Sequence, residues 1–266
     1  MNKTVSVNLF ISVYKNVAFL KKVLDSVKQQ YYKNFIVTIL EDGEFDDMRE
    51  FINNVKSTFP IFHFSQKDLG FRKNKILNAG LRKNTAELCV FIDGDCVLHP
   101  KFLYEYVRHF DGASVLFGKR TYLDHKTSAL LLSTNIIVPS KWTMYKNKSK
   151  HVEESFYLPF KPVLIKKHHF LIGSNMGIPF STLKAVNGFD EDYTFAGFGE
   201  DCDIEWRIAN EGFSFLNLKT LYFFPSGRWD ILTDNDILIK LPLNNISDSL
   251  NLAYKIINNE DMKNIN

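Results

Sequence analysis

The sequence predicts an α/β fold in which helices cover both faces of a mostly parallel sheet. Four short apolar segments rich in β-branched residues recur along the first half of the chain, and a segment with apolar residues at helical spacing follows each of them. The strand segments are apolar on both faces, which is typical of parallel strands joined by right-handed helical crossovers. The chain of 266 residues is long enough to bury the core of one such domain.

The four strand–helix units follow one another from the N-terminus. The strands are predicted at 5–13, 35–40, 61–64 and 88–92, and the helices at 17–27, 46–55, 74–82 and 100–109. Asn16 stands where the N-cap of the first helix is expected. The second half is predicted to hold a helical stretch that ends near Gly188, a helix over 201–210 and a strand over 213–218.

The periodicity also divides the chain into parts. We expect one domain over 1–226, made of a first part over 1–118, an insertion over 119–170 and a last part over 171–226. The insertion has no sustained periodicity and is predicted to be mobile. The tail over 227–266 is predicted to be helical and to fray at its end.

Composition argues against several classes of protein. No stretch approaches the roughly eighteen uninterrupted apolar residues of a membrane span, and no export signal is visible at the N-terminus. Cys89, Cys96 and Cys202 are too few and too scattered for a disulfide framework, so a cytoplasmic protein is expected. The 33 basic and 30 acidic residues nearly balance, which argues against a general nucleic-acid binder. The sequence leaves the oligomeric state open.

Polar residues stand at the ends of all four predicted strands. The first strand ends near Ser12 and Tyr14, Asp42 follows the second, Asp68 follows the third, and the Asp-Gly-Asp sequence at 93–95 follows the fourth. In parallel sheets, ligands bind beyond the carboxyl ends of the strands because the loops there converge. The sequence therefore predicts a nucleotide and metal site at this edge.

Asp93 and Asp95 directly follow the most apolar strand, with Gly94 between them. Carboxylate oxygens in such a place suit Mn²⁺ or Mg²⁺, which would bridge a diphosphate and neutralise its charge as it leaves. The alternative is an ordinary surface turn, because Asp and Gly are favoured turn residues. The position after a buried strand favours the metal site.

Further side chains are placed to hold a nucleotide. Arg72 stands at a helix start, where a basic residue is unfavourable unless an anion is bound, and its guanidinium group can hold phosphate oxygens. Lys73 beside it is equally compatible with a solvated surface lysine. Tyr14 can stack on a base and Asp42 can accept a hydrogen bond from it, although such residues are usually rim and turn residues.

Glu200, Asp201 and Asp203 place three carboxylates within four positions at a helix start. Acidic residues stabilise the N-terminus of a helix, so at least one of them is expected to do only that. If this helix start lies across a cleft from Asp95, one carboxylate can act as a general base that deprotonates an acceptor hydroxyl.

Taken in order, these residues resemble family 2 glycosyltransferases of the GT-A fold, a Rossmann-like fold. The matching segments are Ser12-Val13-Tyr14, Glu41-Asp42-Gly43, Gly70-Phe71-Arg72, Asn78-Ala79-Gly80-Leu81, Asp93-Gly94-Asp95, Gly188-Phe189-Asp190-Glu191 and Gly199-Glu200-Asp201 with Arg207. The resemblance is to the branch with bacterial chondroitin-polymerase-like and galactosyltransferase-like domains, and it covers about 5–226. The ordered motifs are specific to the fold and the reaction, not to the sugar.

The resemblance implies an inverting transfer of a hexosyl or N-acetylhexosaminyl group from a nucleoside diphosphate sugar, by likeness a UDP-sugar. The acceptor would be a hydroxyl of a glycan or lipid-linked molecule, in bacterial surface polysaccharide synthesis. The implied roles are base for Asp201, acceptor contact for Glu200 and Asn175, metal binding for Asp95 and Asp93, and donor binding for Ser12, Tyr14, Asp42, Arg72, Asp93 and Gly94.

One departure from the family pattern concerns the metal. Relatives often carry a histidine ligand after the strand that corresponds to 220–224, where this chain continues with Pro225 and Ser226. Water or Ser226 would then complete the metal shell, or the metal would bind weakly until the donor arrives. The missing histidine supports an alternative, a non-catalytic binder of a sugar nucleotide or glycan, whereas Glu200 and Asp201 weigh against it.

Two further expectations concern an alternative enzyme class and the role of the segment over 119–170. A sugar nucleotidyltransferase is less favoured, because residues 12–16 are not the Gly-rich basic loop that such enzymes place after the first strand. The Lys, Trp and Tyr residues of 119–170 predict that this segment orders over bound donor and touches the inner face of a membrane as a peripheral contact.

Overall fold

The structure is a computed structural model, and it describes residues 4–155, 164–165, 171–195, 199–218 and 238–240. The strands of the main sheet are β1 (Val7–Val13), β2 (Phe35–Glu41), β3 (Ile61–Ser65), β4 (Leu88–Asp93), β6 (Val115–Phe117), β8 (Leu164–Ile165), β9 (Met176–Pro179) and β10 (Phe215–Asn217). The helices are α1 (Val17–Lys28), α2 (Asp46–Asn54), α3 (Lys73–Leu81), α4 (Phe102–His109), α5 (His125–Ser133), α6 (Lys141–Lys146), α7 (Phe180–Ala185) and α8 (Glu200–Asn210).

The described strands of the main sheet lie in the order β3-β2-β1-β4-β9-β6-β10-β8. β1 is central and pairs in parallel with β2 and β4, so that Ser12 is level with both Leu40 and Asp93. β9 runs antiparallel to its neighbours β4 and β6, and β8 runs antiparallel to β10. The predicted α/β fold with a mostly parallel sheet is confirmed, with β9 as an antiparallel strand inside it.

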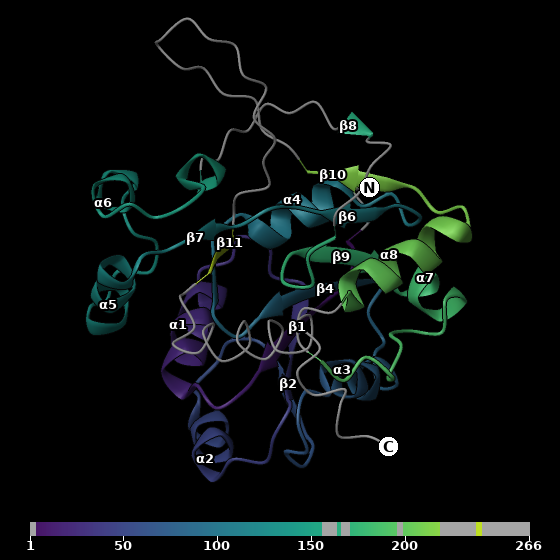
Figure 1. Ribbon diagram of the computed structural model, residues 1–266, viewed down its shortest axis with the longest axis horizontal. Helices are drawn as coiled ribbons and strands as arrows, with labels where there is room; N and C mark the ends of the chain where they lie inside the picture. Colours follow the sequence, from purple (N-terminus) through teal and green to yellow (C-terminus); the bar gives the residue numbers. More distant parts are fainter. Residues whose placement is uncertain (1–3, 156–163, 166–170, 196–198, 219–237, 241–266) are drawn as a thin grey trace, which may run out of the picture.

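Helices cover both faces of this sheet (Figure 1). One face packs against α1, α2 and α4, with Leu20, Met48 and Phe102 among the buried residues. The other face packs against α3, α7 and α8. Neighbouring residues of β1 point to opposite faces, so Leu9 lies in the first cluster and Phe10 in the second, where it stacks on Phe91 at 5.1 Å between ring centroids.

The predicted first helix is confirmed together with its cap. The Asn16 side chain accepts a hydrogen bond from the Phe19 backbone N–H at 3.0 Å, which satisfies one of the free donors at the start of α1. The predicted helical tail and its polar end lie outside the described residues, apart from β11 (Leu238–Lys240), which pairs with β5 (Cys96–Leu98) and β7 (Thr121–Tyr122). None of the described helices is both long enough and apolar enough to cross a membrane.

The segment that was expected to be irregular has regular structure over 121–155. Asp124 caps α5 by accepting hydrogen bonds from two backbone N–H groups, and Ser140 caps α6. Leu131 and Met144 of these helices are buried in a small separate cluster with residues of α1, β5 and a 3₁₀ turn at Val152–Ser155. Sequence periodicity missed the helices because each is short and buries few residues. The mobility of the segment stays a prediction.

Candidate active site

The Asp-Gly-Asp sequence is folded directly against the end of β1. The Gly94 N–H donates to the Ser12 carbonyl at 2.7 Å, and the Asp42 N–H donates to the Val13 carbonyl at 3.1 Å. A Cβ atom on Gly94 would lie 2.6 Å from Val13 Cγ1 and 3.0 Å from the Ser12 oxygen, so a larger residue would push the turn away. Glycine therefore lets both carboxylates stand close to the strand edge.

Asp93 lies between two cationic side chains. Lys73, the first residue of α3, donates to Asp93 Oδ1 at 2.9 Å, and the Arg120 guanidinium lies 3.9 Å from Oδ2. Asp95 is only 4% exposed and accepts a hydrogen bond from the Cys96 thiol at 3.4 Å. Asp93, Asp95 and Cys96 offer ligand atoms within 4.8 Å of one another. The two carboxylates fit a hard cation such as Mn²⁺ or Mg²⁺, whereas a thiol is a soft ligand.

The predicted nucleoside end of the site lies beyond β1 and β2. Tyr14 is 51% exposed, contacts the Phe45 ring edge-on, and donates its hydroxyl to Asp68 at 3.1 Å. The two carboxylate oxygens of Asp42 accept from Gln66 Nε2 and from the Arg72 N–H, both at 2.7 Å. Asp42 therefore already orders the loop that carries Arg72 at the start of α3.

The Arg72 guanidinium donates to the Lys67 carbonyl of the same loop. Lys67 and Arg72 thus close the turn that ends at the N-terminus of α3. The structure places Arg72 at this helix start, as predicted, with its guanidinium bonded to the loop that precedes the helix.

Two carboxylates open helix α8. The chain enters α8 through Gly199 in the left-handed conformation, with φ of 87°. Asp201 Oδ2 accepts the Gly173 N–H at 2.8 Å, and a Cβ on Gly173 would lie 2.4 Å from Asp201 Oδ1. Burial and the adjacent Asp201 raise the pKa of Glu200, Lys73 opposes this shift, and Asp93 adds to it. Glu200 therefore lies in the field of the Lys73–Asp93 pair.

A chain of contacts joins the two acidic groups. Arg120, whose guanidinium lies near Asp93, also donates to the Ser174 hydroxyl, and the neighbouring Gly173 holds Asp201. The carboxylates of Asp93 and Asp201 are thus linked through Arg120, Ser174 and Gly173. Asp203, in contrast, accepts from the Arg207 guanidinium at 2.6 Å and 2.9 Å, so it is the carboxylate with a structural partner.

Asn175 is fully buried, with 0% of its surface exposed. Its Oδ1 accepts from the Tyr106 hydroxyl at 2.7 Å, and its Nδ2 donates to the Lys119 carbonyl at 2.5 Å. Direct contact with an acceptor would require this side chain to leave both bonds. In this structure Asn175 instead holds the backbone at Lys119, the residue before Arg120.

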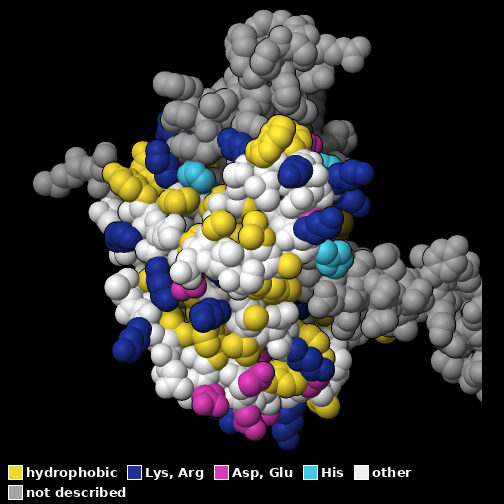
Figure 2. Space-filling view, turned by 90° about the vertical axis from the view of Figure 1, so that its left-hand side faces the viewer, with side chains coloured by type: hydrophobic (Ala, Val, Ile, Leu, Met, Phe, Trp, Pro, Cys, Tyr) yellow, Lys and Arg dark blue, Asp and Glu magenta, His cyan; other side chains and the backbone are white. Residues whose placement is uncertain are grey.

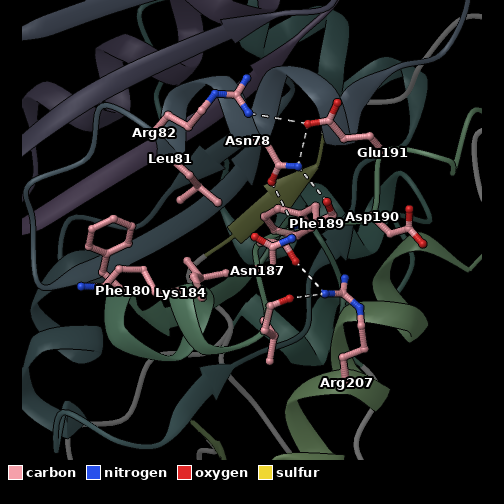
Figure 3. A pocket seen from close by; sticks show the side chains of 13 residues that line it. Asn78, Leu81, Arg82, Phe180, Lys184, Asn187, Phe189, Asp190, Glu191 and Arg207 are labelled. Atoms are coloured by element: carbon pink, nitrogen blue, oxygen red, sulfur yellow. Dashed lines mark hydrogen bonds and ion pairs between the residues drawn. The ribbon is translucent and has the colours of Figure 1, made fainter.

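The loop over 186–191 ties α3 to α8 (Figure 3). Asn78 donates to the Phe189 carbonyl at 2.7 Å and accepts the Phe189 N–H at 2.9 Å. Arg207 donates to the carbonyls of Val186 and Gly188 at 2.7 Å and 2.8 Å. The Gly188-Phe189-Asp190-Glu191 motif therefore fixes the helix that carries Asp201 against the helix that carries Lys73. A cavity of about 720 Å³ beside this loop is lined by no predicted site residue.

Two cationic residues of the site were missed or left undecided by sequence reasoning. Lys73 was equally compatible with a solvated lysine, but its side chain is only 17% exposed and bonded to Asp93. Arg120 falls in the segment without periodicity, and its partners Asp93 and Ser174 are distant in sequence. The region where a histidine ligand was missing, 222–226, lies outside the described residues.

The strand order, the acidic pair at the end of β4 and the carboxylates at the start of α8 define a GT-A protein of the α/β class. The chain belongs to glycosyl transferase family 2, whose family model matches residues 9–186.

The curated relatives are larger proteins. Chondroitin synthase of Escherichia coli is 24% identical over 207 residues, which cover 72% of this chain and 30% of that protein. Validoxylamine A glucosyltransferase of Streptomyces hygroscopicus is 24% identical over 218 residues, covering 77% and 51%. Hyaluronan synthase of Pasteurella multocida is 23% identical over 244 residues, covering 84% and 25%. This chain thus spans about half or less of their length.

Solved structures share the fold. Mannosyltransferase PcManGT from Pyrobaculum calidifontis, in complex with GDP-Man and Mn²⁺, superposes with a TM-score of 0.56 at 14% identity, over 90% of this chain and 57% of that one. Staphylococcus aureus TarS 1–349, in complex with UDP-GlcNAc, gives a TM-score of 0.60 at 14% identity, over 90% and 59%. The predicted GT-A fold and family are confirmed.

Proposed function

We propose that the protein is an inverting, metal-dependent glycosyltransferase that moves a sugar from a nucleoside diphosphate sugar, by preference a UDP-sugar, to a hydroxyl of a glycan or lipid-linked acceptor. The observation that carries this proposal is that Asp93 and Asp201, from distant parts of the chain, are linked by the contacts of Arg120, Ser174 and Gly173. An acidic pair for a cation and a separate carboxylate for a base are the two components that this transfer needs.

The donor would lie across the carboxyl ends of β1, β2 and β4. Tyr14, with half of its surface exposed, is available to stack on a base, and Ser12 and Gly94 form the floor beneath the diphosphate. Asp42 would contact the base, and its carboxylate is already held in place by hydrogen bonds from Gln66 and Arg72. The complex of the TarS neighbour with UDP-GlcNAc supports a nucleotide sugar as donor.

Asp93 and Asp95 would hold the divalent cation, and the Mn²⁺ in the complex of the PcManGT neighbour supports this choice. When bound, the cation neutralises negative charge on the departing diphosphate. The chain itself supplies Lys73 and Arg120 on either side of Asp93, so positive charge already surrounds the place of the diphosphate.

Asp201 would take the proton from the acceptor hydroxyl as that oxygen attacks the anomeric carbon. Its Oδ2 is fixed by the Gly173 N–H, which holds the carboxylate in one orientation. Glu200, beside it, would accept a hydrogen bond from the acceptor. The proposed role for Asn175 is indirect, since it positions the Lys119 end of the loop that carries Arg120.

Diphosphate release from a panel of sugar nucleotides tests the proposed function. With Mn²⁺ and candidate glycan acceptors, we expect one UDP-sugar to give UDP in step with glycosylated product. Release of pyrophosphate would identify a nucleotidyltransferase, and donor binding without any product over the whole panel would favour the non-catalytic binder.

Peripheral contact with the cytoplasmic face of a membrane is a further part of the proposal. On the face shown in Figure 2, Lys and Arg side chains are spread with apolar side chains between them, and acidic side chains gather lower down. Trp142 and Tyr145 of α6 are 78% and 47% exposed, and Lys141 and Lys146 flank them. Aromatic rings next to lysines suit the surface of an anionic bilayer.

Replacing Trp142 with alanine is expected to weaken binding to phosphatidylglycerol vesicles about tenfold, because an indole ring loses its burial in the interface. Sedimentation with vesicles measures the effect. The matched control is Trp206→Ala, which removes an equally large ring, 65% exposed, from α8. Equal binding by wild type and Trp142→Ala would contradict the membrane contact.

A further inference from the structure

Arg120 follows β6 and lies where the two acidic groups of the site meet. Its side chain is only 18% exposed, and Nε donates to the Tyr122 hydroxyl at 2.8 Å. The guanidinium carbon lies 5.0 Å from the centre of the Tyr122 ring. A further bond to the Ser174 hydroxyl leaves the guanidinium 3.9 Å from Asp93 Oδ2. Tyr122 and Ser174 thus fix the orientation of the Arg120 side chain, which points toward the carboxylate of Asp93.

Arg120 shares Asp93 with a second cation, Lys73. An arginine guanidinium is always charged at neutral pH, and its planar fork suits phosphate oxygens. Asp93 is shared, because Lys73 holds its other oxygen at the shorter distance of 2.9 Å. A buried cation is stabilised by a close anion, and a phosphate placed over Asp93 would come within reach of the guanidinium, which lies 3.9 Å from Asp93 Oδ2.

The two cations differ in their surroundings along the site. Lys73 comes from α3 and follows Arg72, whose N–H is bonded to Asp42 at the nucleoside end. Arg120 contacts Ser174, the neighbour of the glycine that holds Asp201 at the acceptor end. A diphosphate lying over Asp93 would therefore have its nucleoside-bearing phosphate near Lys73 and its sugar-bearing phosphate near Arg120.

The geometry points to Arg120 as a donor-binding residue that holds the sugar-bearing phosphate and, through Ser174, connects donor binding to the loop that holds Asp201. The inference rests on the proposed function and adds to it a residue that binds the donor and the orientation of the diphosphate in the site. In the transfer, the acceptor oxygen forms a bond to the anomeric carbon while the bond between that carbon and the phosphate oxygen breaks, and the electron pair of the broken bond stays on the phosphate oxygen. Arg120 stabilises the charge formed there, while the proton of the acceptor hydroxyl goes to Asp201.

Binding of UDP and UMP in the presence of Mn²⁺ tests this role by calorimetry. Because a charge-assisted pair to the second phosphate is lost, we expect Arg120→Gln to bind UDP about tenfold to a hundredfold more weakly, with UMP affinity changed by less than about threefold. Arg120→Lys, which keeps the charge but not the planar fork, should recover part of the UDP affinity. Hydrogen exchange should show UDP protecting 171–175 in wild type and not in Arg120→Gln.

The matched control is Arg49→Gln, which removes an exposed arginine of α2 that is 54% exposed and paired only with the exposed Asp46 among the described residues. It should leave both affinities unchanged. Equal loss of UDP and UMP binding in Arg120→Gln would assign Arg120 a merely structural role and overturn the inference, as would unchanged binding of both. If wild type itself fails to prefer UDP over UMP, the proposed donor class fails, and the role of Arg120 fails with it.

Discussion

Replacing Asp201 with asparagine is expected to lower the rate of sugar transfer by about a hundredfold to ten-thousandfold while donor affinity stays within about twofold. The reason is that the amide cannot take a proton, although its oxygen can still accept the Gly173 N–H that positions Asp201 at 2.8 Å. Turnover with the active UDP-sugar and calorimetry with UDP measure the two quantities on the same preparation.

The matched variant for this experiment is Asp203→Asn. Asp203 stands two residues further along α8, but its carboxylate is bonded to Arg207. Its replacement should cost thermal stability and leave the chemical step close to wild type. Glu200→Gln should chiefly raise the KM for the acceptor. Unchanged turnover in Asp201→Asn would remove Asp201 as the base.

Replacing Asp95 with alanine is expected to weaken Mn²⁺-dependent binding of UDP at least about a hundredfold, because a buried carboxylate at the metal site is lost. Isothermal titration with and without Mn²⁺ measures the effect, and chelation of the metal from wild type should reproduce it. Adding Mn²⁺ back should restore UDP binding to the chelated wild type but not to Asp95→Ala.

Two variants separate metal binding from folding in that experiment. Asp95→Asn keeps the shape of a side chain that is 4% exposed, and it should show the same loss with a thermal midpoint close to wild type. Asp46→Ala removes an acidic side chain that is 95% exposed on α2 and should change nothing. Metal-dependent UDP binding that survives in Asp95→Asn would show that the cation lies elsewhere.

The sequence predicted the part of the fold that depends on local pattern. Alternating strand and helix periods gave β1 to β4 and α1 to α4 closely, and the parallel register then brought Ser12 level with Asp93. The direction of β9 was not predictable. Its four residues, Met176–Pro179, are all buried, and a short apolar run carries no information on whether it lies parallel or antiparallel to its neighbours.

The candidate site shows the same limit. Asp93 and Asp95 were found because they follow a buried strand, and Asp201 because it opens a helix. Arg120 was not found, since its partners Asp93 and Ser174 are distant in sequence and no local pattern marks it. The Asp42 bonds were equally hidden, because they depend on how the loop at 66–72 folds back.

The antiparallel strand β9 has a consequence for how such chains diverge. Phe117 at the end of β6 pairs with Met176 at the start of β9, and the Gly118 N–H donates to the Asn175 carbonyl at 3.1 Å. The polypeptide that departs at 118 therefore returns to the same point of the sheet. Since the entropy of closing a loop grows only slowly with its length, closure at this point sets little limit on how long the excursion between 118 and 175 can be.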